Sequence, residues 1–364
     1  MKRRLLALVT LCFALVGFST AAGAAVSTFE GPIRAMTTKD LIPHYKSNSS
    51  NSWYYENYYF TSKLRGGITL AFHCKFSNVG LQNGKAVFIT ELKLPGKKKL
   101  YLATRLKKGE WDYKSDHFEV KVGDNSMSGK PGKLKVVFKN DTVSGWVEFT
   151  NTLRPWVPGT GRLKVGGKSY HYSLLAPRAS VKGQLVLLKE GSKTIELKGS
   201  GQATHSYMTG GPHQLFKRWV RLEHIGSKHT IALSTIQVPS GQWASMLYIA
   251  KGRRVLVQRF DVLPKPLQVK VDTKHVNQYR VPIELLLSGS NGKPSIKGKI
   301  IAKKLISRAD QLKDLNRFER FIVEKFAKPV YYRFNADYKI IFQVNGADET
   351  VEGTGVYVYQ QLNK

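Results

Sequence analysis

The stretch Lys133–Phe149, KLKVVFKNDTVSGWVEF, contains two runs of residues that favour β-strands. The runs Lys133–Phe138 and Thr142–Phe149 are rich in Val and Phe, and residues 139–141, with the sequence KND, separate them. Alternation of apolar and polar residues places the apolar side chains on one face of a strand, and Asn and Asp favour the turn between strands. Both runs are therefore predicted to be strands.

The same pattern recurs through most of the chain, at intervals of about ten residues that suit an antiparallel meander, sandwich or barrel. Further examples are Gly67–Phe76, Lys85–Leu94, Thr230–Val238 and Tyr338–Val344. The segment LLAPRASVKG, around Ala176–Ser180, interrupts two β-rich halves of similar length. We therefore predict an all-β protein with an N-terminal domain over residues 25–176 and a C-terminal domain over residues 177–364.

One segment of the second half predicts a helix instead. Ser307-Arg308-Ala309-Asp310 has the form of a capping box, and Pro329 would stop the helix. Between them, apolar residues follow helical spacing. They are Leu312, Leu315, Phe318, Ile322 and Phe326. The pattern predicts a single amphipathic helix that packs against the second β-domain.

The first residues resemble a secretory leader, because basic residues at positions 2–4 precede the apolar run Leu5–Phe18 and the small residues Ala22-Gly23-Ala24. We expect residues 1–24 to be a signal peptide and the protein to be exported, most simply to a periplasm. Cleavage would leave Cys74 as the single cysteine, so no internal disulfide can form. A free cysteine in an apolar run is expected to be a small buried side chain.

The chain is strongly basic: 58 Lys and Arg stand against 25 Asp and Glu, for a net charge of +33 spread over both halves. For an exported protein this charge favours anionic lipid head groups or acidic glycans over nucleic acid, which we do not expect as a partner. The densest basic group is a candidate for membrane docking, or alternatively an ordinary solvated hairpin. It consists of Lys97, Lys98, Lys99, Arg105, Lys107 and Lys108.

Aromatic residues crowd the segment Trp53–Phe60, WYYENYYF. Rings with polar tips suit a barrel lumen, where the ring meets an apolar ligand and the hydroxyl reaches water. Ordinary cross-strand aromatic pairs explain the segment equally well. Trp53, Tyr55 and Tyr58 are accordingly candidate ligand contacts.

Histidines mark the segment Gly199–Trp219, GSGQATHSYMTGGPHQLFKRW, which we expect near the start of the second domain. No carboxylate or cysteine stands at a spacing that would complete a metal site with His205 and His213, so neither metal nor cofactor is expected. Imidazole suits acid–base chemistry, but the sequence shows no acid to pair with His205. His205, His213, Arg218 and Trp219 are candidate ligand contacts.

Three segments together resemble the lipocalin-like stress-survival factors first known from fungi. They are Ile68–Gly80, Leu175–Gly183 and Gly199–Trp219. The resemblance implies two tandem lipocalin-like antiparallel barrels that handle hydrophobic molecules such as sphingolipids. Related tandem barrels include carotenoid hydratases and tocopherol cyclases. The hydratases carry a His-Asp-His-Asn-Trp-Gly-like signature, whereas Thr204–Gly210 reads THSYMTG and lacks both the acid and the Asn-Trp pair.

We therefore expect an exported lipid-binding or lipid-carrier protein that holds an apolar ligand in a barrel or between the barrels. One alternative is a hydratase, cyclase or isomerase that acts on an isoprenoid-like substrate, with His205, His213 and Tyr207 near the chemistry. A second alternative is an envelope protein that binds acidic glycans.

Overall fold

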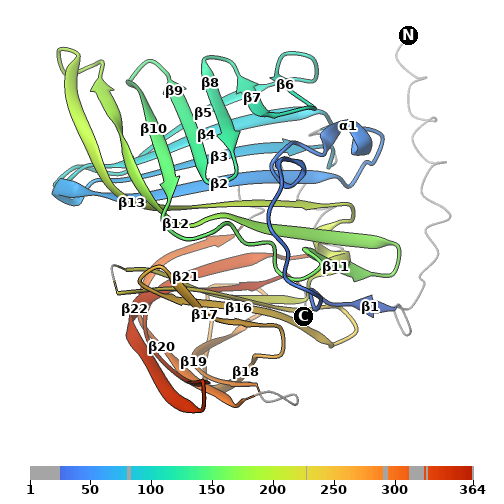
Figure 1. Cartoon of the computed structure of the whole chain (residues 1–364). Helices are drawn as coiled ribbons and strands as arrows, with labels where there is room; N and C mark the ends of the chain where they lie inside the picture. The colour runs from blue at the N-terminus through green and yellow to red at the C-terminus, as the bar shows by residue number, and fades with distance from the viewer. Residues whose placement is uncertain are drawn as a thin grey trace, which may run out of the picture.

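The computed structural model describes residues 25–79, 83–226, 228–289, 294–310, 324 and 327–362. These residues form two curled antiparallel β-sheets, one above the other in Figure 1. The predicted fold class, two tandem barrel-like β-domains, is confirmed.

The first sheet has 13 strands, in the order β5-β4-β3-β2-β13-β12-β10-β9-β8-β7-β6, with β1 and β11 paired beside β12. Its strand bounds are β1 Val26–Ser27, β2 Tyr55–Leu64, β3 Thr69–Ser77, β4 Lys85–Lys93, β5 Leu100–Leu106, β6 Asp112–Tyr113, β7 Phe118–Val122, β8 Asn125–Lys130, β9 Lys133–Lys139, β10 Val143–Asn151, β11 Arg162–Val165, β12 Lys168–Leu187 and β13 Lys193–Met208. The opening motif of the sequence forms β9 and β10, which pair antiparallel as adjacent strands.

The second sheet has nine strands, in the order β17-β16-β15-β14-β22-β21-β20-β19-β18. Its strand bounds are β14 Arg218–Ile225, β15 His229–Gln237, β16 Trp243–Lys251, β17 Arg254–Arg259, β18 Leu263–Val271, β19 Arg280–Gly289, β20 Ile296–Asp310, β21 Val330–Val344 and β22 Ala347–Gln361. In the described part of the chain, the two outermost strands, β17 and β18, do not pair with each other.

The chain passes from the first sheet to the second between Met208 and Arg218, so the boundary predicted at 176/177 falls inside β12. The register of β12 against β13 shifts on both sides of Ala176, and Pro177 follows in this irregularity. The sequence break is thus a β-bulge within one long strand, because a bulge needs irregular residues but does not end the strand. Residues 199–208 therefore belong to β13, the last strand of the first sheet along the chain, and not to the second sheet.

Each sheet encloses its own apolar core, and a third apolar cluster joins the barrels. The joining cluster includes Phe29, Trp156, Tyr170 and Tyr248, all nearly or fully buried. Arg178, which the bulge of β12 carries, donates from Nη1 to the carbonyl of Gly226 in the second barrel at 3.1 Å. The barrels therefore share a packed apolar interface fixed by polar contacts.

The complete helical elements of the described residues are short: α1 Tyr45–Asn48, α2 Pro212–Leu215 and two 3-10 turns at Thr38–Asp40 and Arg65–Gly67. Glu324, within the predicted helix, is also helical. The residues of the predicted capping box, Ser307–Asp310, lie in β20, where they pair with β21. That helix start is wrong, because these residues satisfy their backbone groups in a strand ladder. The predicted helical positions 312–322 and 326 lie outside the described residues. No helix in the described ranges is long and apolar enough to cross a membrane.

Candidate functional site

The aromatic segment and the histidine segment meet in the first barrel as neighbouring strands. β2 and β13 pair antiparallel, with Tyr58 opposite His205 and Glu56 opposite Tyr207. Successive side chains of a strand point to opposite faces, so these four side chains share one face, toward the interior. Glu56 and Tyr58 are completely buried, and His205 is 2% exposed. The fold thus assembles one polar cluster from two distant motifs.

Glu56 is the acid that the sequence reasoning did not find for His205. His205 Nε2 lies 2.7 Å from Glu56 Oε1, across a separation of 149 residues in the chain. His205 Nδ1 lies 3.0 Å from the carbonyl oxygen of Asp40. A carbonyl can only accept, so Nδ1 carries a hydrogen and a single proton lies between Nε2 and Oε1. This Glu56–His205 pair is neutral overall, whichever atom holds that proton.

The chain segment before β2 completes the hydrogen bonding of the pair. The His44 backbone N–H donates to both oxygens of Glu56, at 3.0 and 3.2 Å, and Tyr54 Oη donates to Oε2 at 2.6 Å. Tyr58 Oη donates to the Leu41 carbonyl at 2.6 Å, and its ring stacks on His205 with centroids 4.1 Å apart. Buried polar groups are costly unless they are satisfied, so these contacts fix the pair in one arrangement.

A cavity of about 240 Å³ lies against the pair, and His205 and Tyr207 form part of its wall. The Tyr207 ring lies between His44 and His171, with centroid distances of 4.3 and 4.0 Å. Burial lowers the pKa of His171 to about 3 and also lowers the pKa of His44. Both imidazoles are therefore neutral at pH 7.

An ion pair stands on the wall of this cavity. Arg34 Nη1 lies 2.8 Å from Asp40 Oδ2, and both residues line the cavity. Burial alone would raise the pKa of Asp40, but the hydrogen bonds from Arg34 and Thr37 lower it overall. Asp40 is therefore a carboxylate at neutral pH, while its backbone carbonyl orients His205.

The structure separates the remaining predicted ligand contacts from this site. Trp53 packs edge-on against His213 with centroids 5.5 Å apart, and neither is among the described residues that line the cavity. Tyr55 and Trp219 pack against the apolar cluster between the barrels. Arg218 lines a different cavity, in the second barrel. Of the predicted contacts, Tyr58, His205 and Tyr207 come together.

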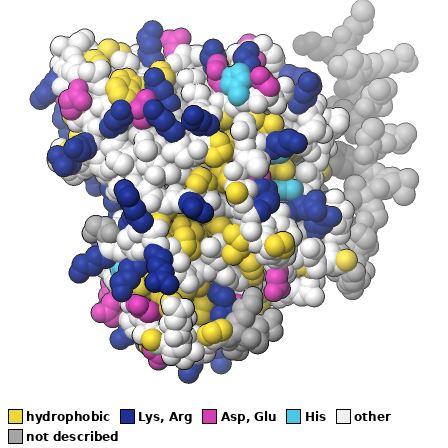
Figure 2. All heavy atoms as spheres, viewed as in Figure 1, with side chains coloured by type: hydrophobic (Ala, Val, Ile, Leu, Met, Phe, Trp, Pro, Cys, Tyr) yellow, Lys and Arg dark blue, Asp and Glu magenta, His cyan; other side chains and the backbone are white. Residues whose placement is uncertain are grey.

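The six basic residues predicted as a docking patch fall at opposite ends of one strand. Lys97–Lys99 precede β5 and Lys107 and Lys108 follow it, and a strand of seven residues spans about 23 Å. Lys97 pairs with Glu190, and Lys99 Nζ lies 2.5 Å from Glu91 Oε2. Figure 2 shows Lys and Arg scattered over both barrels on this face. Docking at these residues stays a prediction, now with two separated basic groups.

Sequence reasoning missed Glu56, His44 and His171, and only the first had a usable signal. Glu56 is the single acidic residue in WYYENYYF, and strand alternation places it on the same face as Tyr58. An acid between inward-facing aromatic residues is a buried acid. His44 and His171 lie on other segments, so only the fold brings them to the site.

Metal binding and cysteine chemistry find no support in the geometry. Within the described ranges, no group of three or more His, Cys, Asp or Glu side chains is arranged to hold a metal ion. Cys74 is buried in the first barrel, where burial raises the pKa of its thiol well above the usual value. A thiol in that state is a poor nucleophile.

Comparisons with known proteins locate this chain by its fold. No family model matches the sequence, and no curated protein matches it. An AttH-like protein of Nitrosomonas europaea shares 13% identity with a TM-score of 0.54, over 90% of this chain and 97% of that one. CghA with Sch210972 shares 9% identity with a TM-score of 0.58, over 93% and 96% of the two chains. Kievitone hydratase from Nectria haematococca shares 13% identity with a TM-score of 0.50, over 91% and 97%. At such identities the comparison shows a common fold, that of tandem-barrel proteins of this kind.

Proposed function

We propose that this protein is an enzyme that transfers a proton to or from an apolar substrate bound in the first barrel. The observation that carries the proposal is the buried, hydrogen-bonded Glu56–His205 pair beside a cavity. Hydration, cyclisation and isomerisation of an isoprenoid-like molecule all begin with such a proton transfer. The proposed substrate class therefore follows the enzyme alternative that the sequence already suggested.

An acidic pair and a neutral imidazole, that of His44, lie together at this cavity. The Glu56–His205 pair, buried beside the cavity, can release its proton from imidazolium or from carboxylic acid. His44, neutral at pH 7, can accept a proton from the substrate, whereas the low pKa of His171 makes it a weak base. The Tyr207 ring stacks on both imidazoles and so fixes their positions at the cavity. Kievitone hydratase is named for a hydration and has the same fold, which supports this class of reaction.

A second candidate, a carrier of lipids or other apolar molecules, is favoured by a different observation. Both ring nitrogens of His205 are already bonded, and Glu56 is completely buried. The pair could therefore serve to lock β2, β13 and the segment 38–44 together around a bound molecule. Under either function we propose that the protein works outside the cytoplasm, on the leader pattern of residues 1–24, and meets anionic membranes through its basic surface. Binding of acidic glycans stays a sequence-based prediction.

Deuterium transfer separates the two functions. The purified protein is incubated in D₂O with a panel of isoprenoid alkenes, and the products are analysed by mass spectrometry. An enzyme incorporates deuterium at carbon, and Glu56→Gln and His205→Gln abolish the label while equilibrium dialysis still detects binding of the same compounds. Glu148→Gln, which removes a surface carboxylate of the same barrel, serves as the matched control and keeps the label. Binding without label in the native protein would identify a carrier instead.

A further inference from the structure

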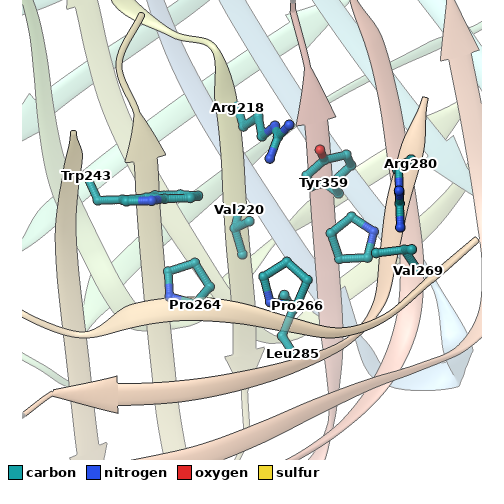
Figure 3. A pocket seen from close by; sticks show the side chains of 10 residues that line it. Arg218, Val220, Trp243, Pro264, Pro266, Val269, Arg280, Leu285 and Tyr359 are labelled. Atoms are coloured by element: carbon teal, nitrogen blue, oxygen red, sulfur yellow. The ribbon is translucent and has the colours of Figure 1, made fainter. Parts of the chain in front are cut away.

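The second barrel contains a cavity of its own, of about 260 Å³, that the proposed function does not use. Its lining comes from β14 (Arg218, Val220), β22 (Tyr359), β16 (Trp243), β18 and β19. Figure 3 shows Arg218, Tyr359 and Arg280 gathered along one side, with proline rings and Leu285 opposite. The cavity is thus polar along one wall and apolar along the other.

Among the described residues that line the cavity, the polar wall carries positive charge and no carboxylate. The Nε atom of Arg218 is buried and has no hydrogen-bond partner among the described residues. Arg280 lines the same cavity, and the described lining residues include no Asp or Glu. Burial raises the pKa of Tyr359 to about 12, so the phenol stays protonated and neutralises neither arginine. A guanidinium cannot lose its proton in a protein, so two of them at one cavity favour an anion between them.

Strand β14 places the side chains of Arg218 and Trp219 on opposite faces of the sheet. Trp219 belongs to the apolar cluster between the barrels, whereas Val220, next along the strand, is in the core of the second barrel. Alternation along the strand therefore turns Arg218 inward with Val220. Of these two adjacent residues, Trp219 packs at the interface between the barrels, and Arg218 lines the cavity of the second barrel.

The side chains of the opposite wall are apolar. Pro264 and Pro266 of β18 line it together with Leu285 of β19. Proline lacks a backbone N–H, and it is tolerated here because β18 is an edge strand. A ligand with one anionic end and an apolar body matches both walls.

We propose that this cavity binds a small carboxylic acid with an apolar body, with its carboxylate between Arg218 and Arg280. The planar guanidinium fork matches a carboxylate through paired hydrogen bonds. The volume is below the range of about 300–1,000 Å³ that is typical of sites for drug-sized ligands. It therefore selects a short aliphatic or single-ring acid over a long fatty acid.

Calorimetric titration with octanoate and with 1-octanol, which has the same chain length but no charge, tests the proposal. We expect octanoate to bind and octanol to bind at least about 10-fold more weakly, because a charge-assisted contact is lost. Arg218→Met and Arg280→Met should each weaken octanoate binding by about 10- to 100-fold. Arg254→Met removes an exposed arginine of β17 that does not line the cavity, and should leave binding unchanged.

Because Arg218 is partly buried, thermal melting first establishes that its variant is folded. The exposed Arg280 provides an independent variant if Arg218→Met does not fold. Equal binding of octanoate and octanol, no detectable binding of octanoate, or octanoate binding unchanged in the folded arginine variants would each overturn the proposal.

Discussion

Replacing the two members of the Glu56–His205 pair, singly and together, tests whether they form one energetic unit. Glu56→Leu removes the acceptor used by His205 Nε2, Tyr54 Oη and the His44 N–H, all in a completely buried setting. Removing one partner of a buried, hydrogen-bonded pair costs about 3–5 kcal/mol. His205→Phe leaves Glu56 with one fewer partner and the Asp40 carbonyl without its donor, so we expect a similar loss.

The double variant should be more stable than the sum of the two losses implies. With both groups replaced, neither Oε1 of Glu56 nor Nε2 of His205 is left buried and unpaired, and a coupling free energy of about 1–3 kcal/mol is expected. Urea unfolding followed by tryptophan fluorescence measures it, since Trp111 stacks on Phe76 at 4.4 Å in the core of the first barrel.

A surface ion pair of the same barrel provides the control. Lys182 Nζ lies 3.2 Å from Glu148 Oε2, and the Lys182 side chain is 66% exposed. Glu148→Gln should change the unfolding free energy by less than about 1 kcal/mol. If the Glu56 and His205 losses simply add, within about 0.5 kcal/mol, the two side chains do not interact as described and the proposed site loses its basis.

Three further perturbations have defined outcomes. Burial lowers the pKa of His171 from 6.5 to about 3, so the unfolded chain binds an extra proton in that window and stability falls as the pH falls. Relative to the native protein, His171→Asn should reduce this acid slope by up to about 1.4 kcal/mol per pH unit, measured by urea unfolding at several pH values, and an unchanged slope would contradict the assignment. Arg178→Ala removes the contact to Gly226 and should cost about 2 kcal/mol, with faster amide exchange in the loop before β15; unaltered exchange there would argue against the contact. Gly201→Val should destabilise the first barrel by about 1–3 kcal/mol or more, because a Cβ would lie 2.5 Å from the Phe149 ring, and a native-like melting temperature would exclude that close packing.

The strands and the fold class were predictable because their signal is local. Runs such as Lys133–Phe138 alternate apolar and polar residues, so the sequence of each run shows which of its side chains face the core. The boundary near Ala176 and the capping box at Ser307 failed for a common reason. Each segment lies in an irregular part of a long strand. The local sequence around Ala176 does not distinguish a β-bulge from a domain boundary. Likewise, Ser307 and Asp310 have the spacing of a helix cap although they lie in a strand.

The candidate site was only half predictable because its parts come from separate segments. His205 and Tyr58 stood out by their residue types, and the structure places them in contact. The pairing of Glu56 with His205 depends on the neighbour relation between β2 and β13, which strand patterns do not encode. Arg218 was predicted as a candidate ligand contact, and the structure places it at a cavity of the other barrel.

The pairing of β2 with β13 also sets an order of events in synthesis. β2 ends at Leu64 and its partner spans Lys193–Met208, so its contact from Glu56 to His205 bridges 149 residues. Until those later residues emerge, β2 has an unpaired edge rich in tyrosine, and such edges invite association with other chains. A nascent chain cut short before Lys193 would expose that edge permanently. Truncated forms should therefore aggregate or recruit chaperones, and full-length chains should gain protease resistance only once β13 is made.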